Sequence, residues 1–271
     1  MRSAAYYRAV PQLRHPFLDA HVPVAIAHRG GALETAENTR TAFEYAVGLG
    51  YDYLETDIQV TRDGVAVLFH DDRLDRTTDA TGRVSDLTWN ELRGVATAAG
   101  SDQIMRLDEA LEHFPRQRFN VDLKSAGAIE PFCDVMSATG AFDRVIVASF
   151  SDARLTIVRR RFGPRLATAA GPREITQAVA AARTGRRFPA APIALQIPVD
   201  VPLGPRRVSV ATVGLVNAAH RHGVHVHVWT VSDRETIIRL LEMGVDGIMT
   251  DRPLLLREVL VERGEWRSDP N

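Results

Sequence analysis

Residues 53–71 read YLETDIQVTRDGVAVLFHD and contain two strand patterns with a turn between them. β-Branched and apolar residues dominate 53–59 and 65–70, which predicts a β-strand over each range. Asp63-Gly64 separates the two runs and is a strong signal for a tight hairpin turn. This stretch therefore predicts a β-hairpin whose two strands carry polar side chains near their ends.

Outside this stretch, strand patterns alternate with helical patterns. The nine predicted strands span 24–28, 53–59, 65–70, 118–124, 144–150, 165–170, 192–199, 224–230 and 247–251. The eight predicted helices span 39–49, 105–114, 129–139, 152–162, 173–183, 208–222, 233–243 and 253–263. Every strand except 65–70 pairs with a following helix, which favours parallel strands joined by crossover helices. The sequence therefore predicts an α/β fold, a TIM (β/α)8 barrel decorated by the early hairpin.

An open, doubly wound sheet is the alternative to the barrel. It is disfavoured because residues 28–31 read HRGG, where a doubly wound nucleotide-binding fold carries its Gly-rich fingerprint. A chain of 271 residues is an ordinary length for one α/β barrel. We expect an N-terminal arm over 1–22, the barrel over 23–265 and a C-terminal tail over 266–271.

The composition is that of a globular protein, with 45% hydrophobic and 25% charged residues. A formal net charge of −1 gives no global field for nucleic acid, so any basic surface is local. No apolar run approaches the roughly 18 residues of a membrane span, and the N-terminus lacks the apolar core of a signal peptide. We therefore expect a cytoplasmic enzyme with no nucleic-acid partner and no stable membrane insertion. The oligomeric state has no signature in the sequence.

His28 and Arg29 end the first predicted strand. In a barrel, the carboxyl ends of the strands meet at the catalytic mouth. A lone histidine there is more often structural than catalytic, but the neighbouring arginine offers a planar fork suited to phosphate or carboxylate. We interpret the pair as a proton donor beside an anion clamp.

Three carboxylates on two predicted strands are the candidates for a metal site. Glu55 and Asp57 stand two residues apart, so they point to the same side of a strand and can bind one hard cation together. The alternative is a solvated outer face, which the outward-pointing apolar neighbours make less favourable. Asp122 adds a third carboxylate, and Lys124 adds a point charge two residues later.

His70 ends the hairpin strand and is followed by Asp71, which either orients the imidazole or caps the loop. Two histidines flanking a metal-bound phosphate would supply a general base and a general acid. Neither a Gly-x-Ser-x-Gly motif nor a His-Glu-x-x-His motif occurs in the chain. The pattern therefore favours phosphoryl chemistry over a serine hydrolase or a zinc protease.

A second group of histidines lies near the seventh barrel strand. Its members are His220, His222, His225 and His227. Buried or helix-capping histidines are the more ordinary explanation, and a metal cluster is the alternative. Trp229 stands near the end of the same strand, where an aromatic ring can wall the pocket against an alkyl or glycerol group. Core packing is the alternative for this tryptophan.

The motifs occur in a recognisable order along the chain. They are Ala27-His28-Arg29-Gly30, Glu37-Asn38-Thr39, Glu55-x-Asp57, Asp63-Gly64, His70-Asp71, Lys124, Trp229-Thr230 and the run from Gly244 to Pro253. This set resembles the glycerophosphodiester phosphodiesterases, a family of phospholipase C-like barrels, over 24–253, most specifically up to Leu92. The resemblance implies hydrolysis of glycerophosphodiesters to glycerol 3-phosphate and an alcohol, with one divalent cation, Mg²⁺ or Ca²⁺.

The resemblance also implies a role for each motif residue. The implied acid–base pair is His28 and His70, and the implied metal ligands are Glu55, Asp57 and Asp122. The implied phosphate ligands are Arg29 and Lys124, and the implied support or pocket residues are Glu37, Asn38, Asp71 and Trp229. The short segment after His70 implies that no insertion domain is present.

Two positions depart from the family pattern. The family usually carries glutamate where this chain has Asp122, which puts metal choice and affinity in doubt, and asparagine where it has Ser232. A lysophospholipase D-like enzyme is one alternative, and an apolar ramp at the mouth, with Trp89, Leu92 and the loop around Phe188 as candidates, would indicate it. A non-catalytic phosphate-binding barrel is a second alternative, which the complete set of histidines and carboxylates disfavours.

Overall fold

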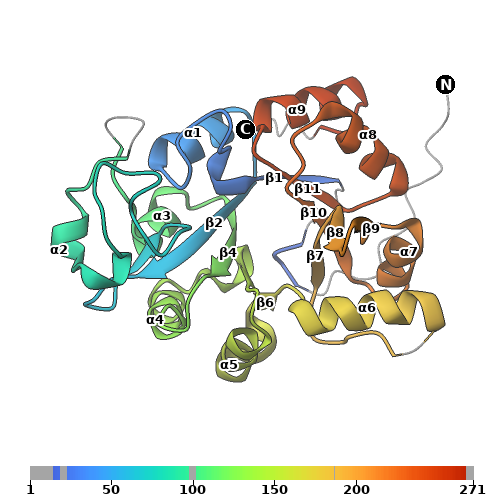
Figure 1. Cartoon of the computed structure of the whole chain (residues 1–271), viewed down its shortest axis with the longest axis horizontal. Helices are drawn as coiled ribbons and strands as arrows, with labels where there is room; N and C mark the ends of the chain where they lie inside the picture. Colours follow the sequence, from blue (N-terminus) through green and yellow to red (C-terminus); the bar gives the residue numbers. More distant parts are fainter. Residues whose placement is uncertain (1–14, 19–22, 98–101, 186, 267–271) are drawn as a thin grey trace.

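The computed structural model describes residues 15–18, 23–97, 102–185 and 187–266. Within these residues, eight parallel strands are arranged in the order β6-β5-β4-β2-β1-β11-β10-β7 (Figure 1). They are β1 (Val24–Ala27), β2 (Tyr53–Val60), β4 (Arg118–Leu123), β5 (Val145–Ala148), β6 (Ala167–Thr168), β7 (Ala194–Pro198), β10 (His225–Trp229) and β11 (Gly247–Thr250). Each coincides with a predicted strand, shortened at one or both ends or, for β2, longer by one residue.

The two outer strands of this order, β6 and β7, approach each other and nearly close the barrel. The amide of Ile193 donates to the carbonyl of Thr168 at 3.0 Å, and the amide of Ala170 donates to the carbonyl of Ala194 at 2.9 Å. These two bonds continue the parallel ladder across the gap. The predicted eight-stranded barrel is therefore confirmed, and the open doubly wound sheet is excluded.

Helices surround the barrel (Figure 1). The described helices are α1 (Arg40–Gly48), α2 (Trp89–Leu92), α3 (Leu107–His113), α4 (Ile129–Thr139), α5 (Asp152–Phe162), α6 (Pro172–Thr184), α7 (Val213–Arg221), α8 (Arg234–Met243) and α9 (Pro253–Glu262). Short 3-10 turns are η1 (His28–Gly30), η2 (Val84–Asp86), η3 (Ala141–Arg144) and η4 (Gly163–Arg165). None of the helices in these residues is long and apolar enough to cross a membrane.

Two antiparallel hairpins depart from the βα pattern. The predicted one is confirmed, because β3 (Ala66–Leu68) pairs with β2. The second joins β8 (Asp200–Leu203) to β9 (Arg206–Ser209) and corrects the predicted helix over 208–222, which begins only at Val213. Gly204 adopts a φ of 60° in the turn, and the alternating residues after it suit a strand better than a first helical turn.

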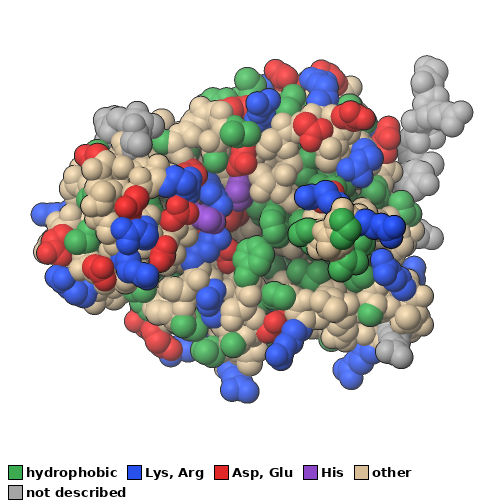
Figure 2. Space-filling model, in the orientation of Figure 1, with side chains coloured by type: hydrophobic (Ala, Val, Ile, Leu, Met, Phe, Trp, Pro, Cys, Tyr) green, Lys and Arg blue, Asp and Glu red, His purple; other side chains and the backbone are tan. Residues whose placement is uncertain are grey.

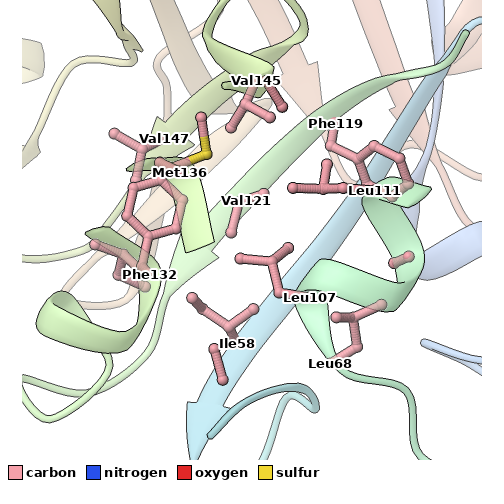
Figure 3. Close-up of a cluster of buried hydrophobic side chains, with 14 of the residues drawn as sticks. Ile58, Leu68, Leu107, Leu111, Phe119, Val121, Phe132, Met136, Val145 and Val147 are labelled. Atoms are coloured by element: carbon pink, nitrogen blue, oxygen red, sulfur yellow. The ribbon is translucent and has the colours of Figure 1, made fainter. Parts of the chain in front are cut away.

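The apolar core lies between the outer face of the sheet and the helices (Figure 3). Ile58 packs there with Leu107 and Phe132. Because side chains alternate along a strand, this outward position of Ile58 directs the odd-numbered residues of β2 into the barrel. The described part of the N-terminal arm packs under the barrel, where the ring of Phe17 lies edge-on to Tyr53 at 5.4 Å. The site is therefore built at the opposite, open end.

Candidate active site

A pocket with about 780 Å³ of empty space, part of it open solvent, lies at the carboxyl ends of the barrel strands. One side, called here the charged side, carries His28, Arg29, Glu55, Asp57, His70, Asp122 and Lys124. The other, called the apolar side, carries Ala148, Phe150, Ala169, Ala170, Pro172, Ile175 and Trp229. Figure 2 shows histidine and charged side chains on one flank of the hollow and hydrophobic ones on the other. The structure thus brings all the predicted catalytic, phosphate and metal residues to one pocket.

His28 is oriented by a carboxylate from the last strand. Its Nδ1 lies 2.6 Å from Oδ1 of Asp251, a hydrogen bond that leaves Nε2 facing the pocket, 3.8 Å from Oε2 of Glu55. Burial lowers the pKa of His28, but the carboxylates of Glu55 and Asp251 outweigh it and leave this pKa raised. Positive charge on His28 is therefore favoured by its surroundings.

Asp251 was not assigned a role from the sequence, although it lies in a motif that carries the resemblance. It follows β11, whose parallel pairing with β1 sets Thr250 beside Ala27, so its side chain comes next to His28. The hydroxyl of Ser232 accepts the backbone N–H of Asp251 at 3.3 Å. The serine that departs from the family pattern thus helps to hold the carboxylate that orients His28.

Arg29 is tied to three carboxylates. Its backbone N–H donates to Oε2 of Glu55 at 3.0 Å, its Nη1 donates to Oε1 of Glu37 at 3.2 Å, and its Nε lies 2.9 Å from Oδ2 of Asp57. The residue has a φ of 52°, a left-handed conformation that non-glycine residues seldom adopt. Such strained backbone persists where surrounding contacts hold it, and here those contacts fix the guanidinium at the mouth.

Lys124 bridges two of the predicted metal ligands. Asp57 and Asp122 are register partners on β2 and β4, and the Nζ of Lys124 lies 2.7 Å from Asp57 Oδ1 and 2.6 Å from Asp122 Oδ2. Burial raises the pKa of Asp57, but Lys124 and Arg29 outweigh it and lower this pKa overall. Burial leaves the pKa of Asp122 raised despite the lysine.

The carboxylates of the charged side are only partly neutralised. Burial, reinforced by Asp57, raises the pKa of Glu55 to about 7. The Oδ1 atom of Asp122 is buried and has no hydrogen-bond partner among the described residues. In the same residues no three His, Cys, Asp or Glu side chains are gathered in a metal-binding arrangement. The Lys124 ammonium lies between Asp57 and Asp122 and supplies the positive charge at this point.

His70 is held by a second carboxylate network. Its Nδ1 lies 2.5 Å from Oδ1 of Asp71. Arg76 donates to Asp71 at 2.7 Å and to Glu37 at 2.7 and 2.9 Å. Hydrogen bonds from Arg76, with a further one from His70, lower the pKa of Asp71 to about 2. Glu37 also binds Arg29, the neighbour of His28. Arg76 therefore connects the segment that carries His28 with the segment that carries His70.

Arg76 is a site residue that no sequence pattern reveals. It lies in the loop after β3, in a stretch that also contains Arg73 and Arg83, and no spacing rule distinguishes it from these. Asn38, by contrast, was predicted as a support residue. Its Nδ2 donates to Oδ2 of Asp57 at 3.2 Å, and its Oδ1 accepts the hydroxyl of Thr56 at 2.7 Å.

The second group of histidines does not assemble into a metal cluster in the described residues. His220 binds Asp246 at 2.8 Å, while His225 and His227 point into the barrel and are buried. Burial lowers the pKa of His227 to about 3, so this side chain is neutral. Trp229 lines the pocket and meets the ring of Phe150 edge-on at 5.6 Å, on the apolar side.

Residues 28–255 match the model of the glycerophosphoryl diester phosphodiesterase family. A probable glycerophosphodiester phosphodiesterase of Mycobacterium tuberculosis is 39% identical over 90% of this chain and 92% of its own length. A human lysophospholipase D is 27% identical over 90% of this chain and 87% of its own length. The structure of an Oleispira antarctica phosphodiesterase in complex with its product sn-glycerol-3-phosphate superposes with a TM-score of 0.73, at 23% identity and with 89% and 97% of the two chains covered.

Proposed function

This chain belongs to the glycerophosphoryl diester phosphodiesterase family, and we propose that it hydrolyses glycerophosphodiesters to glycerol 3-phosphate and an alcohol by histidine acid–base catalysis with a divalent cation. One observation carries the mechanistic part of the proposal. Two histidines, each held at Nδ1 by a carboxylate, present their other nitrogen to a pocket that also contains Arg29 and Lys124. Paired imidazoles beside two cations suit the attack on a phosphodiester and the departure of an alkoxide.

The charged side has the donor chemistry of a hard divalent cation. Carboxylate oxygens are the preferred ligands of Mg²⁺ and Ca²⁺. The unpartnered Oδ1 of Asp122 and the raised pKa of Glu55 both indicate that additional positive charge would be stabilising beside these carboxylates. Glu55, Asp57 and Asp122 would hold the ion once Lys124 turns from the two aspartates toward the phosphate. When bound, the cation would withdraw charge from the phosphate oxygens.

The protein's own residues would bind the phosphate and move two protons. Arg29 and Lys124 neutralise the non-bridging oxygens, and the apolar side excludes water from one flank. One histidine accepts the proton of the attacking hydroxyl, and the other gives a proton to the leaving alkoxide, so the proton count balances. The raised pKa of His28 favours this histidine as the donor. Asp251 and Asp71 keep both rings oriented throughout.

Two oxygen atoms qualify as the nucleophile. One belongs to water and gives glycerol 3-phosphate directly. The other is the neighbouring glycerol hydroxyl of the substrate, which displaces the alcohol and forms a cyclic glycerophosphate that water then opens. Rapid quenching of the reaction distinguishes them, because a cyclic phosphate accumulates transiently only on the second route.

The direct test measures release of glycerol 3-phosphate from glycerophosphocholine and glycerophosphoethanolamine in the presence of Mg²⁺ or Ca²⁺. His28→Ala and His70→Ala should each lower kcat by about 10²- to 10⁴-fold, the usual contribution of a proton-transferring group. His113→Ala is the matched control, since this histidine pairs with Glu44 at 2.9 Å away from the pocket. Wild-type rates in either of the first two variants would contradict the assigned roles.

A lysophospholipase D activity is the second candidate, and the apolar side favours it. The apolar ramp expected at Trp89, Leu92 and Phe188 does not form there, because Leu92 and Phe188 are buried. Phe150, which is 66% exposed, stands at the pocket edge instead. The human relative with this activity in its name supports the same idea. Choline release from lysophosphatidylcholine tests it, and a rate no higher than without enzyme would exclude it.

A further inference from the structure

Large exposed hydrophobic side chains gather at the mouth end of the barrel. Eight are exposed among the described residues, and six of these stand in the loop, hairpin or first helical turn that comes after the carboxyl end of a barrel strand. The six are Leu33, Phe150, Val201, Leu203, Val213 and Leu254. Single exposed apolar residues need no explanation, but such a concentration on one end of a protein marks an interaction surface.

The β8–β9 hairpin carries the most exposed of these side chains. It leaves β7 directly after Pro198. Its base is closed by two backbone hydrogen bonds, in which the N–H groups of Val210 and Ala211 donate to the carbonyl of Val199 at 3.0 and 3.1 Å. The hairpin therefore stands beside β7 at the carboxyl end of the barrel as a formed element. In Figure 1 it lies in front of the barrel, and in Figure 2 hydrophobic and basic side chains cover this position.

The hairpin has one apolar face and one polar face. Directly opposed residues of an antiparallel pair share a face. The apolar face consists of Val201 opposite Val208 and Leu203 opposite Arg206. Leu203 is 67% exposed at the tip, and Arg206 forms no ion pair with any described residue. The tip thus combines an unburied leucine with an unneutralised arginine.

The polar face of the hairpin is internally neutralised. Arg207 forms an ion pair with Asp200 across the two strands. The tip residues are Leu203, Gly204, Pro205 and Arg206, and they include no acidic side chain. The hairpin therefore carries a net positive charge on a chain whose formal charge is −1. This positive charge sits beside the exposed leucine.

We propose that the apolar face of the β8–β9 hairpin is a docking surface for an anionic phospholipid membrane, and that docking turns the mouth of the barrel toward the lipid. Leu203 and Val201 would enter the interfacial layer, while Arg206 contacts lipid phosphates. The hairpin would thereby set the apolar side of the pocket against the lipid, so that a substrate with an acyl chain reaches the charged side without crossing open water.

The size of the surface favours a membrane over a second copy of the chain. A stable protein–protein interface buries about 800 Å² on each partner. The hairpin offers only two exposed apolar side chains on its face, Val201 and Leu203, and the other four at the mouth end stand on separate segments of the chain. Shallow insertion of a few apolar groups, joined to one or two arginines, suits reversible binding to a charged bilayer.

The test measures flotation of the full chain with two kinds of vesicle, one of phosphatidylcholine alone and one of equal parts phosphatidylcholine and phosphatidylglycerol. Wild-type protein should float with the mixed vesicles. Leu203→Asp should lower the partition coefficient about tenfold, because it removes the leucine that enters the lipid and adds repulsion from the anionic headgroups. Arg206→Glu should weaken binding to the mixed vesicles only. Val261→Asp is the matched control, since Val261 is 52% exposed near the end of α9, away from the mouth.

Three outcomes would overturn the docking surface. They are no flotation of the wild-type protein, equal flotation of wild type and Leu203→Asp, and equal losses in Leu203→Asp and Val261→Asp. Sedimentation velocity adds a fourth, because self-association that Leu203→Asp abolishes would assign the hairpin to an interface between copies. Unchanged turnover of glycerophosphocholine in solution would show that Leu203→Asp is folded.

The consequence for acyl-chain substrates rests on the proposed function, whereas vesicle binding does not. The two therefore fail separately. Flotation without glycerophosphodiester turnover would contradict the proposed reaction and keep the docking surface. Turnover in solution without flotation would contradict the docking surface and keep the proposed reaction.

Discussion

The two sides of the mouth are held in place by different forces. On the charged side, each functional group is fixed by another charge, as His28 is by Asp251 and as His70 is by Asp71. On the apolar side, Trp229 and Phe150 meet through their rings, without a charge pair between them. Removing one partner of a partly buried charge pair leaves the other uncompensated, whereas truncating the largely exposed ring of Phe150 loses contact area and one cation–π contact, with Lys124 at 5.8 Å. The charged side should therefore be far less tolerant of substitution.

Among residues that do not line the pocket, Arg76 should give the largest loss of activity when it is substituted. Arg76→Ala removes the hydrogen bonds to Asp71 and Glu37, so the orienting partners of His70 and Arg29 are both released. We expect kcat to fall about 30-fold, or about 2 kcal/mol of transition-state stabilisation, with a smaller change in KM. Steady-state kinetics with glycerophosphocholine measure it.

A positioning role also requires a change that lost stability alone would not produce. Without Arg76, the pKa of Asp71 should rise from about 2 toward its ordinary value of 3.8, and the acid limb of the pH–rate profile should move upward. Arg76→Lys should restore activity only in part, because an ammonium lacks the planar fork. Arg73→Ala is the matched control, as its pair with Asp75 is exposed. Equal losses in both alanine variants would contradict the role of Arg76.

The next largest effect should be a pH dependence of the free energy of unfolding, caused by Glu55 on the charged side. The pKa of Glu55 is about 7 in the folded protein against an ordinary value of 4.5, so the folded state holds a proton that the unfolded chain has released between these values. The contribution of Glu55 to stability is then full below pH 4.5 and falls as the pH rises to 7, by on the order of 1 kcal/mol.

Urea denaturation in chelator at several pH values measures this slope. Glu55→Gln should flatten it, because the amide does not titrate. Saturating Mg²⁺ or Ca²⁺ should also flatten it, since a cation offsets the charge that burial disfavours. A slope that survives in Glu55→Gln would place the titrating group elsewhere.

The smallest effect should come from the apolar side. Phe150→Ala should change kcat/KM for glycerophosphocholine by no more than about threefold, about 0.7 kcal/mol, because the ring is largely exposed. For lysophosphatidylcholine the loss should be larger, since an acyl chain gains contact with this side. Kinetics on both substrates give the ratio. An equal loss on both would remove the distinction between the two sides of the mouth.

The sequence contained the residues of the charged side and the local link between His70 and Asp71, but not the links between distant segments. Glu55, Asp57 and Asp122 were found because strand periodicity and strand ends are local features that one sequence displays. The role of Asp251 depends on β11 pairing with β1, a contact between residues 223 positions apart. The β8–β9 hairpin was not predicted, because residues 200–207 belonged to no predicted element and the helical pattern over 208–222 took in the last two residues of β9.

Metal dependence tests the central claim most directly. Protein stripped with chelator should release glycerol 3-phosphate from glycerophosphocholine at least about 100-fold more slowly, since a Lewis acid supplies several kcal/mol of charge stabilisation. Titrating Mg²⁺ or Ca²⁺ back should restore the rate, and Asp122→Asn should need a higher concentration of the ion for half-maximal activity. Full activity in the presence of chelator, with no response to either ion, would contradict a metal-assisted reaction at the charged side.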